Sequence, residues 1–214
     1  MSQYVPIVSA TVLFSSSSFI DQAMAAFLGS GSVSALNYGS KIVQGINGIA
    51  VVALTTAVLP YLSQMVTVKD WNGLRHTLRT YTALIIVVTL PLTLGLVYFS
   101  EPMVRLLFQR GAFTAEDTYL VAQVQALFLL QIPFYLLDIL VARLISSLNA
   151  NYLLVWRSVL GVVINVLLNY VFMWWLGVAG IALSTSIVFA LMFCYISLTV
   201  SRLLKRTTNL QLTQ

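Results

Sequence analysis

The side chains of this sequence that could do chemistry are acids, amides and amines lying inside long apolar runs. Asp21 and Gln22 stand near the end of the first run, and Lys41, Gln44 and Asn47 stand in the second. Such groups are costly in lipid, and by default they indicate a functional site. We therefore take these five residues as candidates for the lining of a binding cavity. Lys41 either forms an ion pair with Asp21 or extends to the lipid headgroups.

A polar stripe accompanies these residues along the first run. Thr11, Ser15, Ser18 and Gln22 are spaced four, three and four residues apart, which predicts one face of a helix. Two interpretations stay open. Small hydroxyl residues allow close packing between membrane helices, and a polar face can also border a water-filled cavity.

The fourth run carries Gln131, Tyr135 and Asp138 on one helix face, with Arg143 beyond them. Five residues turn a helix by about 140° net, so Asp138 and Arg143 are poorly placed to pair with each other. Each is expected to pair with another helix. Two interpretations of Asp138 and Arg143 stay open: each belongs to a structural ion pair, or they take part in ion or proton coupling.

Nothing in the sequence points to catalysis. It has a single cysteine, Cys194, and a single histidine, His76, which excludes an internal disulfide and makes a zinc site unexpected. Hydrolytic triads, phosphate-binding glycine loops and basic patches interleaved with aromatic residues are absent from the sequence. We expect neither an enzyme nor a nucleic-acid-binding protein, and we expect no cofactor or metal, the identity of any coupling cation being left open.

The elements that must position these residues are membrane helices. Of the 214 residues, 59% are hydrophobic and 8% are charged, against about 25% charged residues in soluble domains. Runs of about 20 apolar residues are long enough to cross a bilayer. The fold class is therefore an all-α integral membrane protein, a six-transmembrane-helix bundle forming one domain over residues 1–214. Its spans are predicted at about 5–28, 42–62, 81–99, 119–142 (148 in the longer interpretation), 159–175 and 181–204.

Basic residues predict the orientation of this bundle. Eight of the eleven fall on the side that holds both termini, and Lys41, Arg105 and Arg110 fall on the other. Because basic residues accumulate on the cytoplasmic side, both termini are predicted to be cytoplasmic. The segment 101–117 reads as a short interfacial helix, and Pro91 and Pro133 predict bends in the third and fourth spans.

Three segments resemble a known family. They are GSVSALNYGSKIVQ (31–44), VLPYLS (58–63) and LFQRGAFTAEDT (107–118), the last being the most specific. The chain is similar in these segments to the MurJ/MviN family of lipid II flippases, within the superfamily of multidrug, oligosaccharidyl-lipid and polysaccharide (MOP) exporters. The resemblance covers essentially the whole chain, but only the second six-helix lobe of the family's two-lobed architecture.

This resemblance implies a function in the bacterial inner membrane. It implies transport of lipid II or a related polyprenyl-pyrophosphate glycan for peptidoglycan or polysaccharide biosynthesis of the cell wall. The implied partners are the lipid bilayer, the glycan lipid and a first lobe, supplied by a missing N-terminal half, a separate chain or a second copy. The alternatives are a cation-coupled small-molecule antiporter of the same superfamily, with Asp21 or Asp138 as the coupling acid, and a non-transporting fragment or partner subunit.

Overall fold

The computed structural model describes the backbone of residues 4–212 and the side chains of residues 15–202, and it is helical throughout. The helices are α1 (Tyr4–Ala26), α2 (Ser32–Thr67), α3 (Trp71–Tyr98), α4 (Ser100–Phe108), α5 (Ala115–Leu129), α6 (Ile132–Ser147), α7 (Tyr152–Leu176) and α8 (Val178–Leu212). In the described part, five stretches are long and apolar enough to cross a membrane: α2, α3, α5 with α6, α7 and α8. α1, with 23 residues, is a sixth helix of spanning length. The protein is therefore a multi-pass membrane protein.

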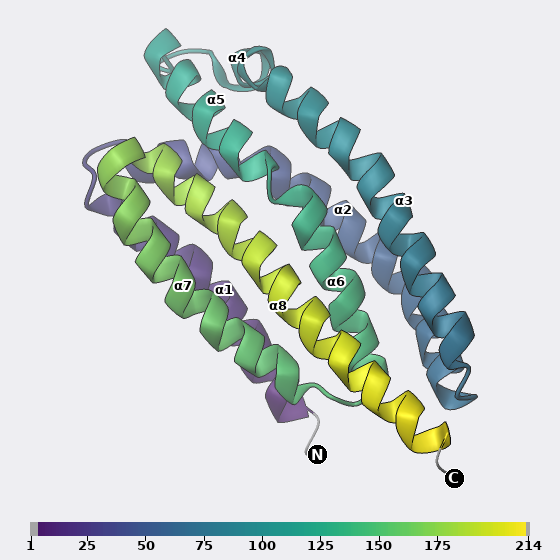
Figure 1. Ribbon diagram of the computed structural model, residues 1–214. Helices are drawn as coiled ribbons and strands as arrows, with labels where there is room; N and C mark the ends of the chain where they lie inside the picture. The colour runs from purple at the N-terminus through teal and green to yellow at the C-terminus, as the bar shows by residue number, and fades with distance from the viewer. Residues whose placement is uncertain (1–3, 213–214) are drawn as a thin grey trace.

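The long helices run roughly side by side, so the bundle has two ends (Figure 1). One end, which we call the terminal end, holds both chain termini and the α2–α3 and α6–α7 connections. The other, which we call the α4 end, holds the α1–α2 turn, α4 and the α7–α8 turn at Gly177, whose positive φ of 58° suits glycine. Both termini on one side agrees with the six spans predicted from the sequence.

Aromatic side chains on α7 mark where the bilayer lies. Trp156 is exposed near the terminal end of this helix, and Tyr170, Trp174 and Trp175 are exposed near the α4 end. Eighteen residues separate Trp156 from Trp174, about 27 Å along a helix, close to the ~30 Å hydrocarbon core. Trp and Tyr prefer the two membrane interfaces. The outer face of α7 therefore faces lipid, and its middle turns lie at membrane depth.

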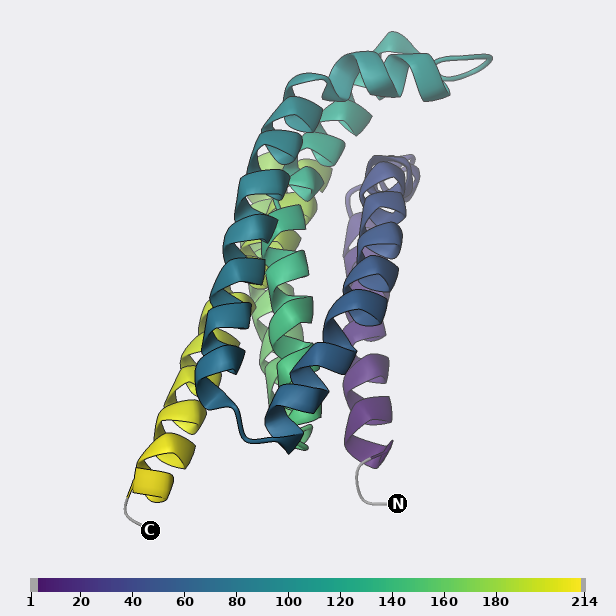
Figure 2. The ribbon, with the colours of Figure 1, turned by 90° about the vertical axis from the view of Figure 1, so that its right-hand side faces the viewer.

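The long helix α2 changes neighbours along its length. Figure 2 shows its first half beside α1 and its second half passing toward α6 and the start of α3. Near its start Gly39 is buried against α5, where a Cβ atom would lie 2.6 Å from Val124 Cγ1. Near its end the hydroxyls of Ser63 and Ser147 are 3.3 Å apart, which joins α2 to α6. These two contacts hold α2 at a slant across the bundle.

The predicted fourth span is two helices rather than one. α5 ends at Leu129 and α6 begins at Ile132, with Pro133 in the first turn of α6. Proline has no N–H to donate to the preceding turn, so the ladder is interrupted there. Ser186 on α8 donates to the Leu127 carbonyl at 2.6 Å, which satisfies one acceptor at the break. Pro91, in contrast, lies within the continuous helix α3.

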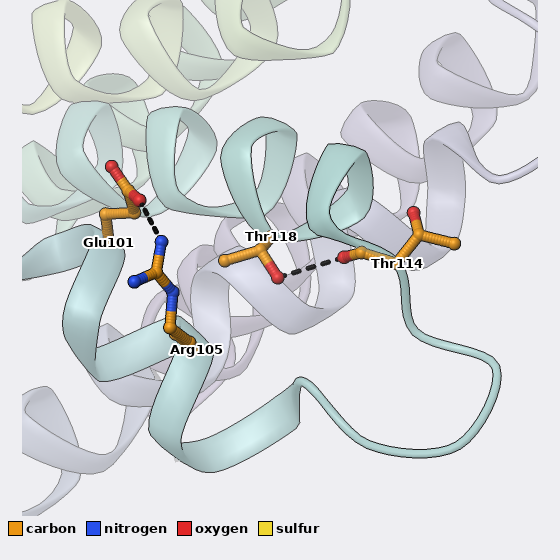
Figure 3. A network of polar contacts seen from close by, with 4 residues as sticks. All are labelled: Glu101, Arg105, Thr114 and Thr118. Carbon is orange, nitrogen blue, oxygen red and sulfur yellow. Dashed lines mark hydrogen bonds and ion pairs between the residues drawn. The ribbon is translucent and has the colours of Figure 1, made fainter.

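The α4 end carries a short helix in a polar setting (Figure 3). Glu101 and Arg105 on α4 form an exposed ion pair at 2.7 Å. Thr114 caps α5, accepting from the Asp117 N–H, and Thr118 donates to the Thr114 carbonyl. The segment 101–117 was predicted as one interfacial helix, but the helix ends at Phe108 and a loop leads to α5. The remaining helices mostly extend beyond the predicted spans: α2 begins ten residues early, at Ser32, and α7 seven residues early, at Tyr152.

We expect Gly39→Ala to destabilise the fold, because the new methyl group would overlap Val124 and approach the Gln125 backbone nitrogen at 3.1 Å. Overpacking of this kind costs about 1–3 kcal/mol. Gly45→Ala on the same helix is the matched control, since nothing lies within 4 Å of a Cβ atom there. Thermal unfolding of the purified chain should show a lower midpoint for the first variant only. Equal midpoints would contradict the close α2–α5 crossing.

Candidate functional site

A cavity of about 370 Å³ lies inside the lobe, between α1, α2, the α5–α6 break, α7 and α8. Its walls are rich in amides and hydroxyls, with one carboxylate and one guanidinium. The polar residues that matter most are Asp21, Gln22, Gln131, Asn165, Thr185 and Arg157. The three aromatic rings at the cavity belong to Phe128, Tyr135 and Phe189. The cavity is thus lined by both polar and apolar side chains, inside a membrane-embedded bundle.

Asp21 is the centre of a network that joins three helices. Its carboxylate is buried and accepts from Asn169 Nδ2 on α7 at 2.6 Å and from Thr185 Oγ1 on α8 at 3.1 Å. Asn169 in turn bonds Asn165 Oδ1 at 3.4 Å and accepts from the Ser184 hydroxyl. Each carboxylate oxygen therefore has a neutral donor. Asn169 lies five residues before Trp174, about 7.5 Å along the helix, so this acid sits below the interface, within the membrane.

The Asp21 network contains the kinds of oxygen atom that bind small cations, although both Asp21 oxygens here accept hydrogen bonds from neutral donors. It gathers carboxylate, amide and hydroxyl oxygens, the ligands that hard cations prefer. Among the described residues no group of three or more His, Cys, Asp or Glu side chains exists that could hold a metal ion. One carboxylate among neutral oxygens suits a proton or a monovalent cation better than a divalent one, whose second charge would be unmatched.

The terminal end of the cavity is bounded by a buried ion pair. Arg157 on α7 donates to both oxygens of Asp138 on α6, at 3.0 Å from Nε and 2.6 Å from the terminal nitrogen. Both side chains are about one-tenth exposed. A two-pronged contact of this kind fixes orientation as well as charge. The pair ties α6 to α7 and closes one side of the cavity wall.

The structure brings four of the five predicted cavity residues to one chamber. Asp21, Gln22, Gln44 and Asn47 line it, and Asn47 has its buried Oδ1 without a hydrogen-bond partner among the described residues. Lys41 is exposed and outside the lining. The proposed Asp21–Lys41 ion pair is therefore wrong, because Asp21 is turned inward to neutral donors on α7 and α8.

The remaining sequence predictions divide in the same way. Asp138 does pair with another helix, as expected, but Arg143 does not share that pair and has no ion pair in the described part of the chain. Of the polar stripe, Ser18 and Gln22 line the cavity, Ser15 does not, and the Thr11 side chain lies outside the described residues.

Sequence reasoning missed the role of Arg157. It is one of the eight basic residues from which the orientation is predicted, but in the structure it is the sixth residue of α7 and is buried. Its signal was available: Asp138 needed a cation on another helix, and Arg157 is the basic residue one turn inside the next span. Asn165 and Asn169 carried the signal of an i, i+4 amide pair, whereas nothing in the sequence alone marked Thr185.

Comparisons with known proteins agree with this architecture. The family profile described as "Lipid II flippase MurJ" matches residues 3–212. The chain is 30% identical over 171 residues to a probable lipid II flippase MurJ of Vibrio cholerae, covering 78% of this chain and 32% of that protein. It is 30% identical over 179 residues to the corresponding Thermotoga maritima protein, covering 84% of this chain and 37% of that one. The chain thus spans about a third of the length of these relatives.

Solved structures show the same fold. A lipid II flippase MurJ in an inward closed conformation superposes with a TM-score of 0.79 at 25% identity, over 90% of this chain and 41% of that one. An outward-facing MATE multidrug resistance transporter of the MOP superfamily superposes with a TM-score of 0.78 at 18% identity, over 92% and 44%. The second likeness shows the fold alone.

We expect the buried ion pair to be costly to break on one side only. Arg157→Gln leaves the Asp138 carboxylate buried without its cation, and such changes cost about 3–5 kcal/mol. The double variant Asp138→Leu/Arg157→Met should recover most of that loss, because no charge remains to be desolvated. Denaturation of the parent and both variants in detergent measures the two losses of stability. A double variant as unstable as Arg157→Gln would contradict this explanation.

Proposed function

The chain belongs to the lipid II flippase MurJ family, and on that premise we propose that it forms one lobe of a flippase for a polyprenyl-pyrophosphate-linked glycan. The observation that carries the proposal is the cavity at membrane depth between α1, α2, the α5–α6 break, α7 and α8, with polar side chains in its walls. Gln22, Gln44 and Asn47 supply donors and acceptors to a hydrophilic headgroup that lipid would exclude. The glycan lipid would be moved across a bacterial inner membrane for cell-wall synthesis.

A complete transport path needs a second wall. Since the chain spans about a third of its relatives' length, we propose that this lobe, residues 1–214 as a single domain, works against a first lobe. The first lobe comes from a preceding segment, a separate chain or a second copy. The exposed polar residues Lys41 and Gln44 on α2 would then face the space between the lobes, where water or headgroups offer hydrogen bonds.

Within this function Asp21 is the group whose charge couples to the conformational change. It is bonded to α7 and α8 from α1, so binding or loss of a proton or monovalent cation there would alter how three helices pack. The same network would serve a cation-coupled antiporter of small molecules, which is the second candidate function. Transport measured with a glycan lipid and with a small molecule distinguishes the two candidate functions directly. Transport of neither substrate would support a non-transporting subunit.

The test is transport by the two-lobe protein in proteoliposomes, with a labelled polyprenyl-pyrophosphate disaccharide. Asp21→Asn keeps the size of the side chain but removes its charge, so the transport rate should fall about tenfold or more, on the scale of a lost charged hydrogen bond. Asp70→Asn is the matched control, because Asp70 caps α3 through Gly73 and Asn caps helices equally well. Unchanged transport in Asp21→Asn would remove Asp21 from the coupling role.

We also propose that both termini are cytoplasmic, because the terminal end carries the excess of basic residues. A thiol introduced as Ala112→Cys at the α4 end should react with an impermeant reagent added outside the cell, and one introduced as Asn72→Cys should not. Cys194 is exposed, so both variants are made with Cys194→Ser. The opposite labelling pattern would reverse the orientation.

A further inference from the structure

Arg143 is a cation inside a membrane span with no partner in the described part of the chain. It lies in the span Ala115–Ser147, four residues before the end of α6, about 6 Å along the helix. Its Nε is buried without a hydrogen-bond partner in the described part of the chain, while the residue as a whole is partly buried. A positive charge at this depth is expected to pair with an anionic or polar group.

The chain itself has no carboxylate side chain left to match it. All six acidic residues lie in the part whose side chains are described. Both Asp138 oxygens accept hydrogen bonds from Arg157, and both Asp21 oxygens accept hydrogen bonds, one from Asn169 and one from Thr185. The other four are engaged or remote: Asp70 caps α3, Glu101 pairs with Arg105, and Glu116 and Asp117 stand in the first turn of α5 at the α4 end.

The charge of Arg143 acts electrostatically on Tyr135, a residue that lines the cavity. Side chains of a helix lean toward its N-terminus, which directs Arg143 back along α6 toward Tyr135. The Tyr135 hydroxyl is within electrostatic reach of Asp138, Arg157 and Arg143, and both Tyr135 and Arg157 line the cavity. The two guanidinium groups and the one carboxylate near Tyr135 leave a net charge of +1, and of these three groups only Arg157 lines the cavity.

The anion that fits is a phosphate carried on a lipid. A guanidinium presents a fork of donors that matches phosphate oxygens, and phosphates are the anions that a bilayer holds at the depth of the last helix turn. Resting on the proposed function, we propose that Arg143 binds a lipid-borne phosphate near the terminal end of α6, outside the cavity, as the first contact of the pyrophosphate before it enters the cavity. An ordinary phospholipid headgroup offers the same chemistry, and the test separates the two sources.

The experiment measures lipid binding to the full chain in phosphatidylcholine nanodiscs, by mass spectrometry of retained lipid. A polyprenyl pyrophosphate, phosphatidylglycerol and the uncharged polyprenol are titrated into the parent and into Arg143→Gln, Arg143→Lys and Arg79→Gln. We expect Arg143→Gln to weaken pyrophosphate binding about tenfold or more. Arg143→Lys should be intermediate, because it keeps the charge but loses the fork. Arg79→Gln, which removes an exposed charge from α3, should match the parent, and polyprenol binding should be equal in all four.

Each outcome decides the proposal. A loss confined to the pyrophosphate assigns the site to the transported lipid, and an equal loss for phosphatidylglycerol assigns it to a membrane headgroup. No loss for either lipid overturns the phosphate site. Arg143→Gln should fold, because it leaves no buried charge behind, and Arg143→Lys keeps the test open if it does not. If the two-lobe protein does not transport the glycan lipid but Arg143→Gln still weakens pyrophosphate binding, the proposed flippase function is wrong and the phosphate site is supported. If transport depends on Asp21 but Arg143→Gln binds the pyrophosphate normally, the flippase function is supported and the phosphate site is wrong.

Discussion

The structure depends on one constraint: polar groups inside a bilayer must find their partners within the protein. Asp21 meets it by accepting one hydrogen bond from α7 and one from α8. A single carboxylate on α1 thereby fixes three helices against one another at membrane depth. Since both donors are neutral, the charge is stabilised by hydrogen bonds but not cancelled. The network is therefore stable as it stands and still sensitive to a proton or a cation, which is what a coupling site requires.

Buried charges have different kinds of partner near the two ends of the cavity. Near the α4 end one acid has only neutral donors, whereas near the terminal end Asp138 and Arg157 cancel and Arg143 remains. The lobe is therefore polarised, with an acid near one end of the cavity and, beyond the other, an arginine without an ion pair among the described residues. Under the proposed function, an anionic headgroup would be attracted at the terminal end and repelled near Asp21 unless that charge were matched by a proton or cation. Such a dependence of substrate position on the state of Asp21 would link binding to coupling within one lobe.

The fold was largely predictable from the sequence, because runs of about 20 apolar residues have few solutions in lipid. Six long helices, termini at one end and the short helix after α3 all follow from that pattern. The break at Leu130–Gln131 was predicted only as a bend, since Pro133 marks where a ladder weakens but not whether a neighbour such as Ser186 supports a full interruption. Candidate residues on α1 and α2 were found because their spacing is local. Their partners were not, because the pairing of Asp21 with Asn169 joins positions 148 residues apart.

The residues that remain exposed carry the last step of the argument. Ser15, Ser18, Lys41 and Gln44 on α1 and α2 are exposed, and Ser18 and Gln44 also line the cavity. Among the residues whose side chains are described, their hydrogen bonds are only to neighbours on their own helices, Gln22 to Ser18 and Gln44 to Ser40. Lipid would leave such a surface unsatisfied, in contrast to the apolar, aromatic-edged outer face of α7. The two faces of the lobe thus demand different surroundings: bilayer on the side of α7, and water or a second polar surface on the side of α1 and α2. That division supports the proposal that the lobe forms one wall of an aqueous path through the membrane.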